Sequence, residues 1–269
     1  MKKVLALVLT TVMMMTMLTA CGGSETAAPT TEATAEAEGA VSEALADGVL
    51  TVGTNAEFPP FEYVGDDGEP DGFDMALVKA IGEKLGVEVK IENMEFASLV
   101  TSIGSKIDIA AAGMTVTEER QQTVDFSNPY YEAVQYVILP ADSTIATAAD
   151  LEGKNIGVQL GTTGDFIATD IAGTTVSPYN KAVDAVNDLI NGKVDCVIID
   201  KNPALVFESK FEGQVVAIDG AQFEFEVENY AIALPKGDAA LAEQINTAIE
   251  ELKADGTFDE LVKTYIEAE

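Results

Sequence analysis

The sequence contains no histidine and no tryptophan, two cysteines and a single arginine. Without histidine the chain cannot form zinc sites of the histidine type or carry Ser-His-Asp or Cys-His catalysis. Positive charge is also scarce, because 15 lysine and arginine residues stand against 46 aspartate and glutamate residues, which gives a formal net charge of −31 at pH 7. This negative charge argues against nucleic acid as a partner. We therefore expect no metal site, no cofactor and no nucleic-acid binding.

The N-terminus has the pattern of a secretion signal. Two lysines precede an apolar run, Val4–Leu18, which is too short to span a membrane. The run ends in Leu18-Thr19-Ala20-Cys21, which resembles the lipobox of bacterial lipoproteins. We expect residues 1–20 to be the signal peptide and Cys21 to carry lipid; the alternative is an ordinary signal peptide with a chance cysteine. Residues 21–47 are poor in large apolar side chains, so we expect a flexible tether and a fold that begins near Val49.

The second cysteine, Cys196, has no partner if Cys21 is lipidated. It lies in the apolar run Val194–Ile199, so we expect a buried, inert thiol and no disulfide.

From Val49 onward the chain alternates between strand and helix patterns. We expect strands at residues 49–54, 87–91 and 107–112, with helices between them. The first helix is expected to have Asp74 as its N-cap and to end at Gly86. Because strands and helices alternate, the pattern predicts a parallel sheet covered on both faces, and so an α/β fold.

The only arginine, Arg120, follows the third expected strand. Thr117 is expected to cap a short helix that places Arg120 at its third position. A strand end followed by a helix N-terminus exposes free backbone N–H groups, which suit an anion, and the arginine fork can hold a carboxylate at two points. The alternative from position alone is a surface arginine on an amphipathic helix.

A second unit of the same kind follows. It is expected to contain a strand at residues 156–160, a helix at 183–190 and a strand that ends at Asp200. Tyr136–Pro140 and Tyr230–Pro235 repeat one pattern at its two ends, an aromatic residue, a short apolar strand and a proline. We interpret them as two strands that cross between lobes; two unrelated edge strands are the alternative. A closing helical region is expected after Leu241.

Several motifs in one order resemble the polar amino-acid-binding proteins of ABC importers, bacterial solute-binding family 3. The resemblance covers nearly the whole chain from Val49 onward and rests on these segments: Asn55–Phe61, Gly72–Asp74, Gly113–Arg120, Val124–Tyr131, Gly161–Thr163 and Asp195 with Asp200. It implies a two-lobed, type II periplasmic-binding-protein-like fold with two hinge strands. The lobes are expected at residues 48–137 with 232–269 and at 138–231, with the ligand in a cleft that closes on binding.

The resemblance also implies roles for the polar site residues. The arginine that matches Arg120 pairs with the ligand α-carboxylate, and the aspartate that matches Asp200 takes the α-ammonium. Thr115 and the backbone at Gly113 line the same pocket. Fixed groups of both signs suit a zwitterion, because neither of its charges is then buried unpaired. From sequence alone, Asp200 could instead cap the helix that begins before Pro203.

The second lobe is expected to add the turn at Thr162 and Thr163, whose hydroxyl and N–H groups would reach the carboxylate. We add Gln159, in the strand before this turn, to the ligand-binding set. Aromatic residues that match Phe58 and Phe96 sandwich the ligand side chain in the family; without the resemblance, core packing is the simpler interpretation of both.

One residue departs from the pattern. Family members that bind basic amino acids often carry an acidic residue at the position of Asn55. Asparagine can hydrogen-bond an amide or hydroxyl group but brings no countercharge, which disfavours a cationic ligand. Glu57 is close in sequence and could supply that charge by reaching into the pocket.

The resemblance implies a binding protein and not an enzyme. We expect a monomer, lipid-anchored to the outer face of the cytoplasmic membrane, that delivers a free polar L-amino acid to an ABC permease. Two alternatives remain open: a receptor that presents the ligand to a membrane signalling protein, and a dehydratase on the same scaffold. Neighbouring genes for a permease and an ATPase would favour transport over sensing, and turnover of a candidate substrate would favour the dehydratase.

Overall fold

The computed structural model describes residues 42–267, so the expected signal peptide, Cys21 and most of the expected tether lie outside the described residues. Over this range, no helix combines the length and the apolar character needed to span a membrane. The first described residues already belong to the fold. Helix η1, Glu43–Leu45, buries Leu45, and the Ser42 hydroxyl donates a hydrogen bond to Asp238. Ordered structure therefore begins before Val49, the position that composition suggested.

The first lobe is built on a five-stranded sheet in the order β5-β1-β6-β14-β7. Strands β5 and β6 pair parallel to β1, whereas β14 pairs antiparallel to both β6 and β7. The strand bounds are β1 Val49–Thr54, β5 Glu88–Asn93, β6 Ile109–Ala110, β7 Val124–Phe126 and β14 Ala233–Pro235. The three parallel strands were predicted, and the two antiparallel strands make the sheet mixed.

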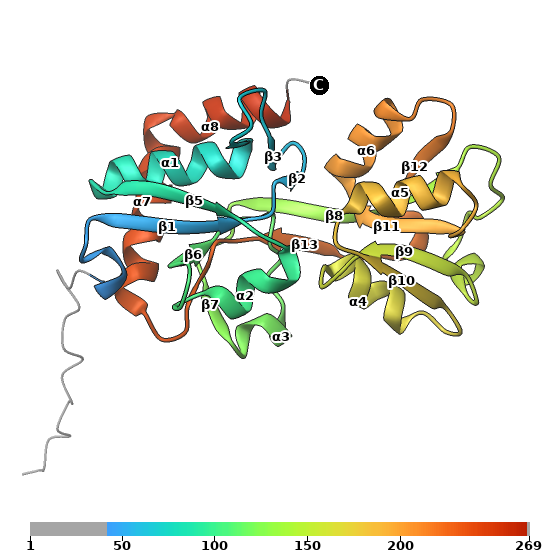
Figure 1. Ribbon diagram of the computed structural model, residues 1–269, viewed down its shortest axis with the longest axis horizontal. Helices are drawn as coiled ribbons and strands as arrows, with labels where there is room; N and C mark the ends of the chain where they lie inside the picture. Colours follow the sequence, from blue (N-terminus) through green and yellow to red (C-terminus); the bar gives the residue numbers. More distant parts are fainter. Residues whose placement is uncertain (1–41, 268–269) are drawn as a thin grey trace, which may run out of the picture. The chain divides into compact units, whose positions relative to one another are not determined.

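Helices cover both faces of this sheet (Figure 1). On one face, α1, α7 and α8 bury apolar side chains against Leu50 and Val52. On the other face, Leu99 of α2 packs with Ile107 and Ala110. Gly53 faces this second layer, where a Cβ would lie 2.3 Å from the Ile107 side chain. The helix bounds are α1 Phe73–Leu85, η2 Phe96–Ser98, α2 Leu99–Ser102, α3 Glu118–Gln121, α7 Ala239–Asp255, α8 Thr257–Leu261 and the π-helical turn η5 Val262–Ile266.

Helix α1 corrects one prediction and confirms another. Its N-cap is Gly72, and Asp74 is a buried residue of the first turn that accepts hydrogen bonds from elsewhere in the fold. The prediction of Asp74 as N-cap was therefore wrong. Gly86 ends the helix at φ 70°, in the left-handed region that favours glycine, as predicted.

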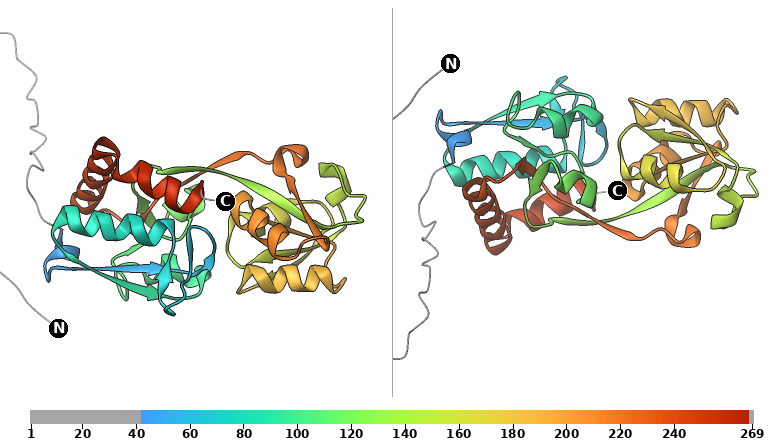
Figure 2. Two further views of the ribbon diagram at one scale, coloured as in Figure 1. Left: turned by 90° about the horizontal axis from the view of Figure 1, so that it is seen from above. Right: turned by 90° about the horizontal axis from the view of Figure 1, so that it is seen from below.

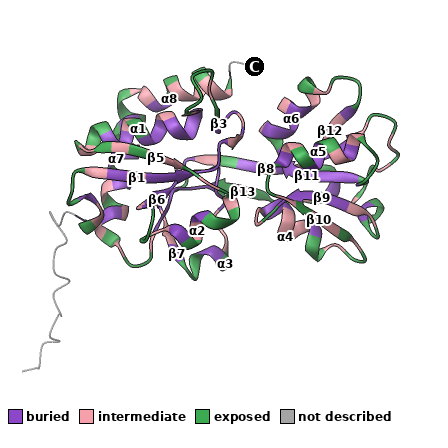
Figure 3. Ribbon diagram, in the orientation of Figure 1, coloured by how far each residue is buried: buried purple, intermediate pink, exposed green. Residues whose placement is uncertain are grey.

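The second lobe contains a six-stranded sheet with the path β10-β9-β11-β8-β12, to which β13 adds by pairing with β8. Strands β10, β9 and β11 run parallel, and β8 is antiparallel to β11 and β12. The strand bounds are β8 Tyr131–Pro140, β9 Asn155–Gln159, β10 Thr175–Tyr179, β11 Cys196–Asp200, β12 Val215–Asp219 and β13 Val227–Tyr230. As Figure 3 shows, buried residues concentrate on the central strands of both sheets.

Alternating residues of β11 face two cores. Val197 and Ile199 pack with α5 and α6, whereas Cys196 and Ile198 pack on the opposite side with Ala168 of α4. The Cys196 thiol is free and buried, and burial raises its pKa to about 12, as expected for an inert thiol. The helix bounds are η3 Ala148–Leu151, α4 Thr163–Asp170, α5 Ala182–Ile190, α6 Lys201–Lys210 and η4 Gly220–Phe223.

Two strands run from one lobe to the other, β8 and β13 (Figure 2). They pair antiparallel, with Val227 opposite Val134 and Tyr230 opposite Tyr131. Residues 135–140 of β8 already pair with β11 and β12 of the second sheet. The crossing therefore lies at residues 131–134 and 227–230. The first range is N-terminal to Tyr136–Pro140, and the second overlaps Tyr230–Pro235 only at Tyr230.

A small three-stranded sheet, β2-β3-β4, lies outside both main sheets. Its strands are β2 Glu57–Phe58, β3 Glu62–Val64 and β4 Pro70–Asp71. Phe58 of β2 is opposite Glu62 of β3 in the antiparallel register. This hairpin was not predicted, because Pro59 and Pro60, which lie between β2 and β3, are residues that interrupt strand pairing.

Candidate functional site

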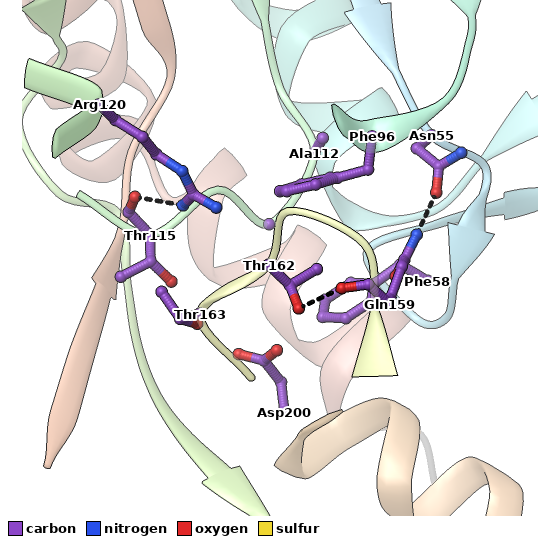
Figure 4. A pocket seen from close by; sticks show the side chains of 11 residues that line it. Asn55, Phe58, Phe96, Ala112, Thr115, Arg120, Gln159, Thr162, Thr163 and Asp200 are labelled. Atoms are coloured by element: carbon purple, nitrogen blue, oxygen red, sulfur yellow. Dashed lines mark hydrogen bonds between the residues drawn. The ribbon is translucent and has the colours of Figure 1, made fainter. Parts of the chain in front are cut away.

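The carboxyl ends of parallel strands from both lobes meet at one pocket (Figure 4). Parallel sheets place ligands at this edge, where loops and helix N-termini converge. The structure brings all ten predicted ligand-binding residues into the lining of this pocket, together with Ala112: Asn55, Phe58, Phe96, Gly113, Thr115, Arg120, Gln159, Thr162, Thr163 and Asp200.

Arg120 takes its position from a short helix that begins as predicted. The Thr117 side chain caps α3 by accepting a hydrogen bond from the Arg120 N–H. The Arg120 side chain is 7% exposed and turns into the pocket, where one Nη donates to the carbonyl of Thr115 at 2.6 Å. The other Nη donates at 2.9 Å to the carbonyl of Gly161, which belongs to the second lobe. The alternative of a surface arginine is therefore wrong.

No carboxylate among residues 42–267 contacts the guanidinium of Arg120 directly. No ion pair among residues 42–267 involves its guanidinium, which lies 5.4 Å from the centre of the Phe96 ring and 5.9 Å from that of Phe166. Burial lowers the pKa of Arg120 to about 10, and Glu228 and Asp200 oppose this shift. The group is thus cationic at neutral pH, and a buried cation without a contacting anion favours an anionic ligand.

Asp200 lies at the end of β11 and is 6% exposed. The backbone places it at the N-cap of α6, but its side chain makes no capping hydrogen bond. Instead, it accepts a hydrogen bond from the hydroxyl of Tyr230 in β13. Burial, reinforced by the negative charge of Glu228, raises the pKa of Asp200 to about 7. Helix capping is therefore not the role of this carboxyl group.

Glu228 is a polar residue of the site that the sequence interpretation missed. Its carboxylate accepts hydrogen bonds from the hydroxyls of Thr115 at 2.6 Å and Thr163 at 2.8 Å, and from the amide of Gln135 at 3.4 Å. It thereby links the crossing strand β13 to residues of both lobes. In the sequence Glu228 is the last of three alternating glutamates, Glu224, Glu226 and Glu228, and it precedes the expected hinge segment Tyr230–Pro235, so nothing singled it out.

The turn before α4 presents hydrogen-bond donors to the same pocket. Thr162 caps α4 by accepting from the Asp165 N–H, and its hydroxyl donates to the carbonyl of Gln159 at 2.8 Å. The first N–H groups of a helix have no partner within it, so Thr163 begins a helix that can receive an anion. Arg120 and this turn therefore face the same part of the pocket.

At the opposite end from Arg120, the pocket is closed by two neutral amides (Figure 4). The Gln159 amide donates to Asn55 Oδ1 at 2.8 Å, and the Asn55 amide donates to the carbonyl of Met94 at 2.8 Å. Phe58 and Phe96 lie between the two ends, with Phe58 buried and Phe96 half-buried. This end of the pocket is therefore polar and uncharged.

Glu57 does not supply a charge to the pocket. Its carboxylate pairs with Lys181 of the second lobe, and both side chains remain partly exposed at 26% and 49%. An exposed ion pair of this kind contributes little to stability, about 0–1 kcal/mol. The suggestion that Glu57 reaches into the pocket was wrong, because the lysine holds it at the rim.

No group of acidic or cysteine side chains within residues 42–267 has an arrangement that could hold a metal ion. The arrangement instead offers a cation, Arg120, and a carboxyl group, Asp200, across one pocket, with hydroxyl and N–H groups beside them. These are the groups that the two charges of a zwitterion require.

Comparisons with known proteins agree with this architecture. Residues 50–268 match the family model of the bacterial extracellular solute-binding proteins, family 3. The chain is 31% identical over 236 residues to the L-cystine-binding protein TcyJ of Escherichia coli (strain K12), which covers 86% of this chain and 88% of that protein. It is similar to a crystal structure of a mutant of ArgBP from T. maritima, with 40% identity, a TM-score of 0.77 and coverage of 84% and 98%.

Two further similar structures contain an amino acid. An ancestral arginine-binding protein bound to arginine and an ancestral arginine-binding protein bound to glutamine are both 40% identical to this chain, with TM-scores of 0.77 and 0.76 and coverage of 81% and 98%. The family consists of binding proteins and not enzymes. With its two α/β lobes and a match over residues 50–268, the chain belongs to the bacterial extracellular solute-binding proteins, family 3.

Proposed function

We propose that this protein binds a free polar L-amino acid by its α-carboxylate and α-ammonium groups and delivers it to an ABC permease. The observation that carries the proposal is the buried guanidinium of Arg120, which has main-chain carbonyls and aromatic rings around it but no contacting carboxylate from residues 42–267. A ligand carboxylate would supply the missing anion. Asp200, across the pocket, would then accept the ligand ammonium.

The remaining site residues have roles that follow from this orientation. The N–H groups at the start of α4, beside Thr162 and Thr163, would add donors to the ligand carboxylate, because the hydroxyls of both threonines already donate to Gln159 and Glu228. Thr115 and the backbone at Gly113 would line the space between the two charged groups. The ligand side chain would extend between Phe58 and Phe96 toward the amides of Asn55 and Gln159.

We further propose that the ligand has an uncharged polar side chain. A cationic side chain would need a countercharge at its end of the pocket, and the amides of Asn55 and Gln159 bring none. The nearby Glu57 is already paired with Lys181. Similar structures are of an ancestral arginine-binding protein bound to arginine and of one bound to glutamine. We therefore expect a preference for uncharged ligands that shows as a higher relative affinity.

Ligand binding is proposed to close the two lobes about residues 131–134 and 227–230. Contacts between the lobes support this mechanism, because the bond from Arg120 to Gly161 and the bond from Gln159 to Asn55 both cross the pocket. The lobes would comprise residues 48–137 with 232–269 and 138–231, except that the boundary in β8 falls nearer residue 134. Closure would give the permease a surface that exists only with ligand bound.

We also propose that Cys21 is lipidated and anchors the protein to the outer face of the membrane. The support is the sequence Leu18-Thr19-Ala20-Cys21 after an apolar run, and a family described as extracellular.

A thermal-shift panel of the 20 L-amino acids tests the proposed function. A ligand at 100 times its dissociation constant adds about 2.7 kcal/mol to stability, which gives a clear shift of the melting temperature. We expect uncharged polar amino acids, glutamine among them, to give the largest shifts. Larger shifts with arginine or lysine would refute the uncharged side chain only, and no shift with any amino acid would refute the function.

A further inference from the structure

Two acidic side chains are buried together behind the pocket wall of the first lobe. Glu62 of β3 and Asp74 of α1 both have 0% exposure, and neither belongs to the residues that line the pocket. The two carboxyl groups are neighbours, because each acts on the pKa of the other through its side chain. Neither takes part in an ion pair within residues 42–267.

The two carboxyl groups differ in the number of hydrogen bonds that they accept. Asp74 Oδ2 accepts from the N–H of Gly113 at 2.8 Å and from the hydroxyl of Tyr130 at 2.7 Å. Asp74 Oδ1 and both oxygens of Glu62 have no donor among the described residues. An oxygen that accepts two donors favours the ionised form, whereas a buried carboxyl without donors favours the protonated form. The proton therefore belongs on Glu62, which can donate it to Asp74 Oδ1 and satisfy that orphaned oxygen.

All ionisable groups that act on Glu62 are acidic or neutral. Asp74 faces it from α1, the more distant Asp200 acts on it from β11, and Tyr130 contributes through its bond to Asp74. Burial raises the pKa of Glu62 well above its usual value, and the charge of Asp74 adds to the shift. Burial also raises the pKa of Asp74, to about 6, against the effect of its two donors. Two ionised carboxylates without a cation would be unfavourable here.

The pair connects two walls of the pocket. Glu62 is the cross-strand partner of Phe58, and Asp74 holds the N–H of Gly113. Gly113 has φ 51°, in the left-handed region, and a Cβ there would lie 2.8 Å from the Phe58 ring. The Phe58 strand and the Gly113 turn are therefore close to each other at the pocket wall. The Glu62–Asp74 pair also connects them, because Glu62 is the cross-strand partner of Phe58 and Asp74 accepts from the Gly113 N–H.

We propose that Glu62 and Asp74 share one proton at neutral pH and act as positioning residues, holding the Phe58 strand against the Gly113 turn so that the first lobe presents a formed half-site. The ligand-binding part of this inference rests on the proposed function; the shared proton does not. Loss of the proton would place two negative charges side by side and push the two walls apart.

The proton can be observed directly. With glutamate labelled by ¹³C at the side-chain carboxyl, one glutamate signal should remain in its protonated position at about pH 6, where ordinary glutamates with a pKa of about 4.3 are ionised. That signal should be missing from Glu62→Gln. If all glutamates of the wild-type protein are ionised at this pH, the inference is wrong, whether or not the variant folds.

The pH dependence of the unfolding free energy should also reveal the proton on Glu62. Unfolded Glu62 ionises near its ordinary pKa while folded Glu62 keeps its proton, so the folded state binds more protons and stability falls as pH rises between the two pKa values. The unfolding equilibrium constant should rise with pH more steeply in the wild-type protein than in Glu62→Gln, by up to about tenfold per pH unit. Glu243→Gln, on the exposed face of α7, is the matched control and should keep the wild-type slope. Equal slopes in Glu62→Gln and the wild-type protein would overturn the inference.

Ligand affinity tests the positioning role. Glu62→Gln retains a donor for Asp74, whereas Glu62→Leu has a similar size and no donor. We expect the leucine variant to bind the amino acid found in the panel about fivefold or more weakly than the glutamine variant, because it leaves a buried charged acceptor unpaired. Equal affinities, with both variants folded by circular dichroism, would contradict positioning. If the wild-type protein binds no amino acid, the proposed function is wrong. The labelling and stability measurements still decide whether Glu62 and Asp74 share a proton.

Discussion

Arg120 is held by two main-chain carbonyls, and this arrangement determines which ligand charge it can accept. A carbonyl orients a guanidinium without neutralising it, so the positive charge remains available in a site with little access to water. Glu228 is close enough to favour the charged form of Arg120, but its own hydrogen bonds go to Thr115, Thr163 and Gln135. The result is an oriented cation that no carboxylate in the described part of the chain contacts.

Asp200 gives the site a pH dependence of known sign. The ligand ammonium needs an ionised carboxylate, and in the ligand-free site burial and Glu228 raise the pKa of Asp200 to about 7. Below this pH the group must lose a proton before it binds the ammonium. We expect the affinity for the amino acid to fall as pH drops below about 7, by up to about tenfold per pH unit.

Calorimetric titration from about pH 8 to about pH 5 measures this dependence, and Asp200→Asn should both weaken binding and remove the slope. Asp142→Asn, on an exposed loop, is the matched control. A dissociation constant of the wild-type protein that stays constant over this range would show that Asp200 does not titrate against the ligand.

At the scale of elements, the turn after β6 places Gly113 where a side chain does not fit. Gly113→Ala would put a Cβ 2.8 Å from the Phe58 ring and would also strain a backbone with φ 51°. We expect clearly weaker ligand binding, because Phe58 has to move out of the pocket wall. Gly68→Ala is the matched control: its φ is 88°, and no atom lies within 4 Å of the added Cβ.

Both glycine variants should lose stability, by about 1 kcal/mol from backbone strain, in thermal unfolding. Only Gly113→Ala should lose affinity in calorimetry. If the two variants bind the ligand equally well, the contact between Gly113 and Phe58 does not shape the site.

The elements that sequence predicted well are those fixed by local signals. The Thr117 cap of α3 and the left-handed Gly86 both depend on residues within one helical turn. The strand ends that carry Asn55 and Asp200 followed from apolar runs that stop at a polar residue. The resemblance to the family, and not these local signals, supplied most of the ten candidate residues. Because parallel strands align their carboxyl ends, the fold gathers them at one pocket.

Errors arose where distant residues determine the structure. Asp74 has the residue type and position of an N-cap, but Gly113 and Tyr130, 39 and 56 residues further along the chain, provide its hydrogen bonds. From sequence alone Glu57 could extend into the pocket, but in the structure it pairs with Lys181 of the other lobe, which lies 124 residues further along the chain. The crossing in β8 depends on its pairing with β13, and the role of Glu228 depends on that same pairing.

At the scale of the whole molecule, the folded receptor is proposed to carry a membrane anchor at its N-terminus. If Cys21 is the lipidated N-terminus of the mature protein, Cys21→Ala should release it from the membrane fraction, because a thioether-linked lipid can no longer form. Fractionation of cells and immunodetection measure the distribution, and the buried Cys196 in the folded region serves as the control position for a cysteine-to-alanine change. A Cys21→Ala protein that remains membrane-bound at the wild-type level would refute the anchor.

The central claim is that one zwitterion is held by charge on both sides of the pocket, and Arg120→Lys tests it most directly. Lysine keeps the positive charge but loses the planar fork that holds a carboxylate at two points. Loss of one partner in a buried, charged hydrogen bond costs roughly 2–5 kcal/mol, about 30-fold to several-thousand-fold in affinity. Circular dichroism should show an unchanged fold.

The decisive measurement is the calorimetric dissociation constant of Arg120→Lys for the amino acid identified with the wild-type protein. The account predicts a value at least about 30-fold higher than that of the wild-type protein. A value within a factor of about three, which corresponds to less than about 1 kcal/mol, would show that Arg120 does not hold the ligand carboxylate.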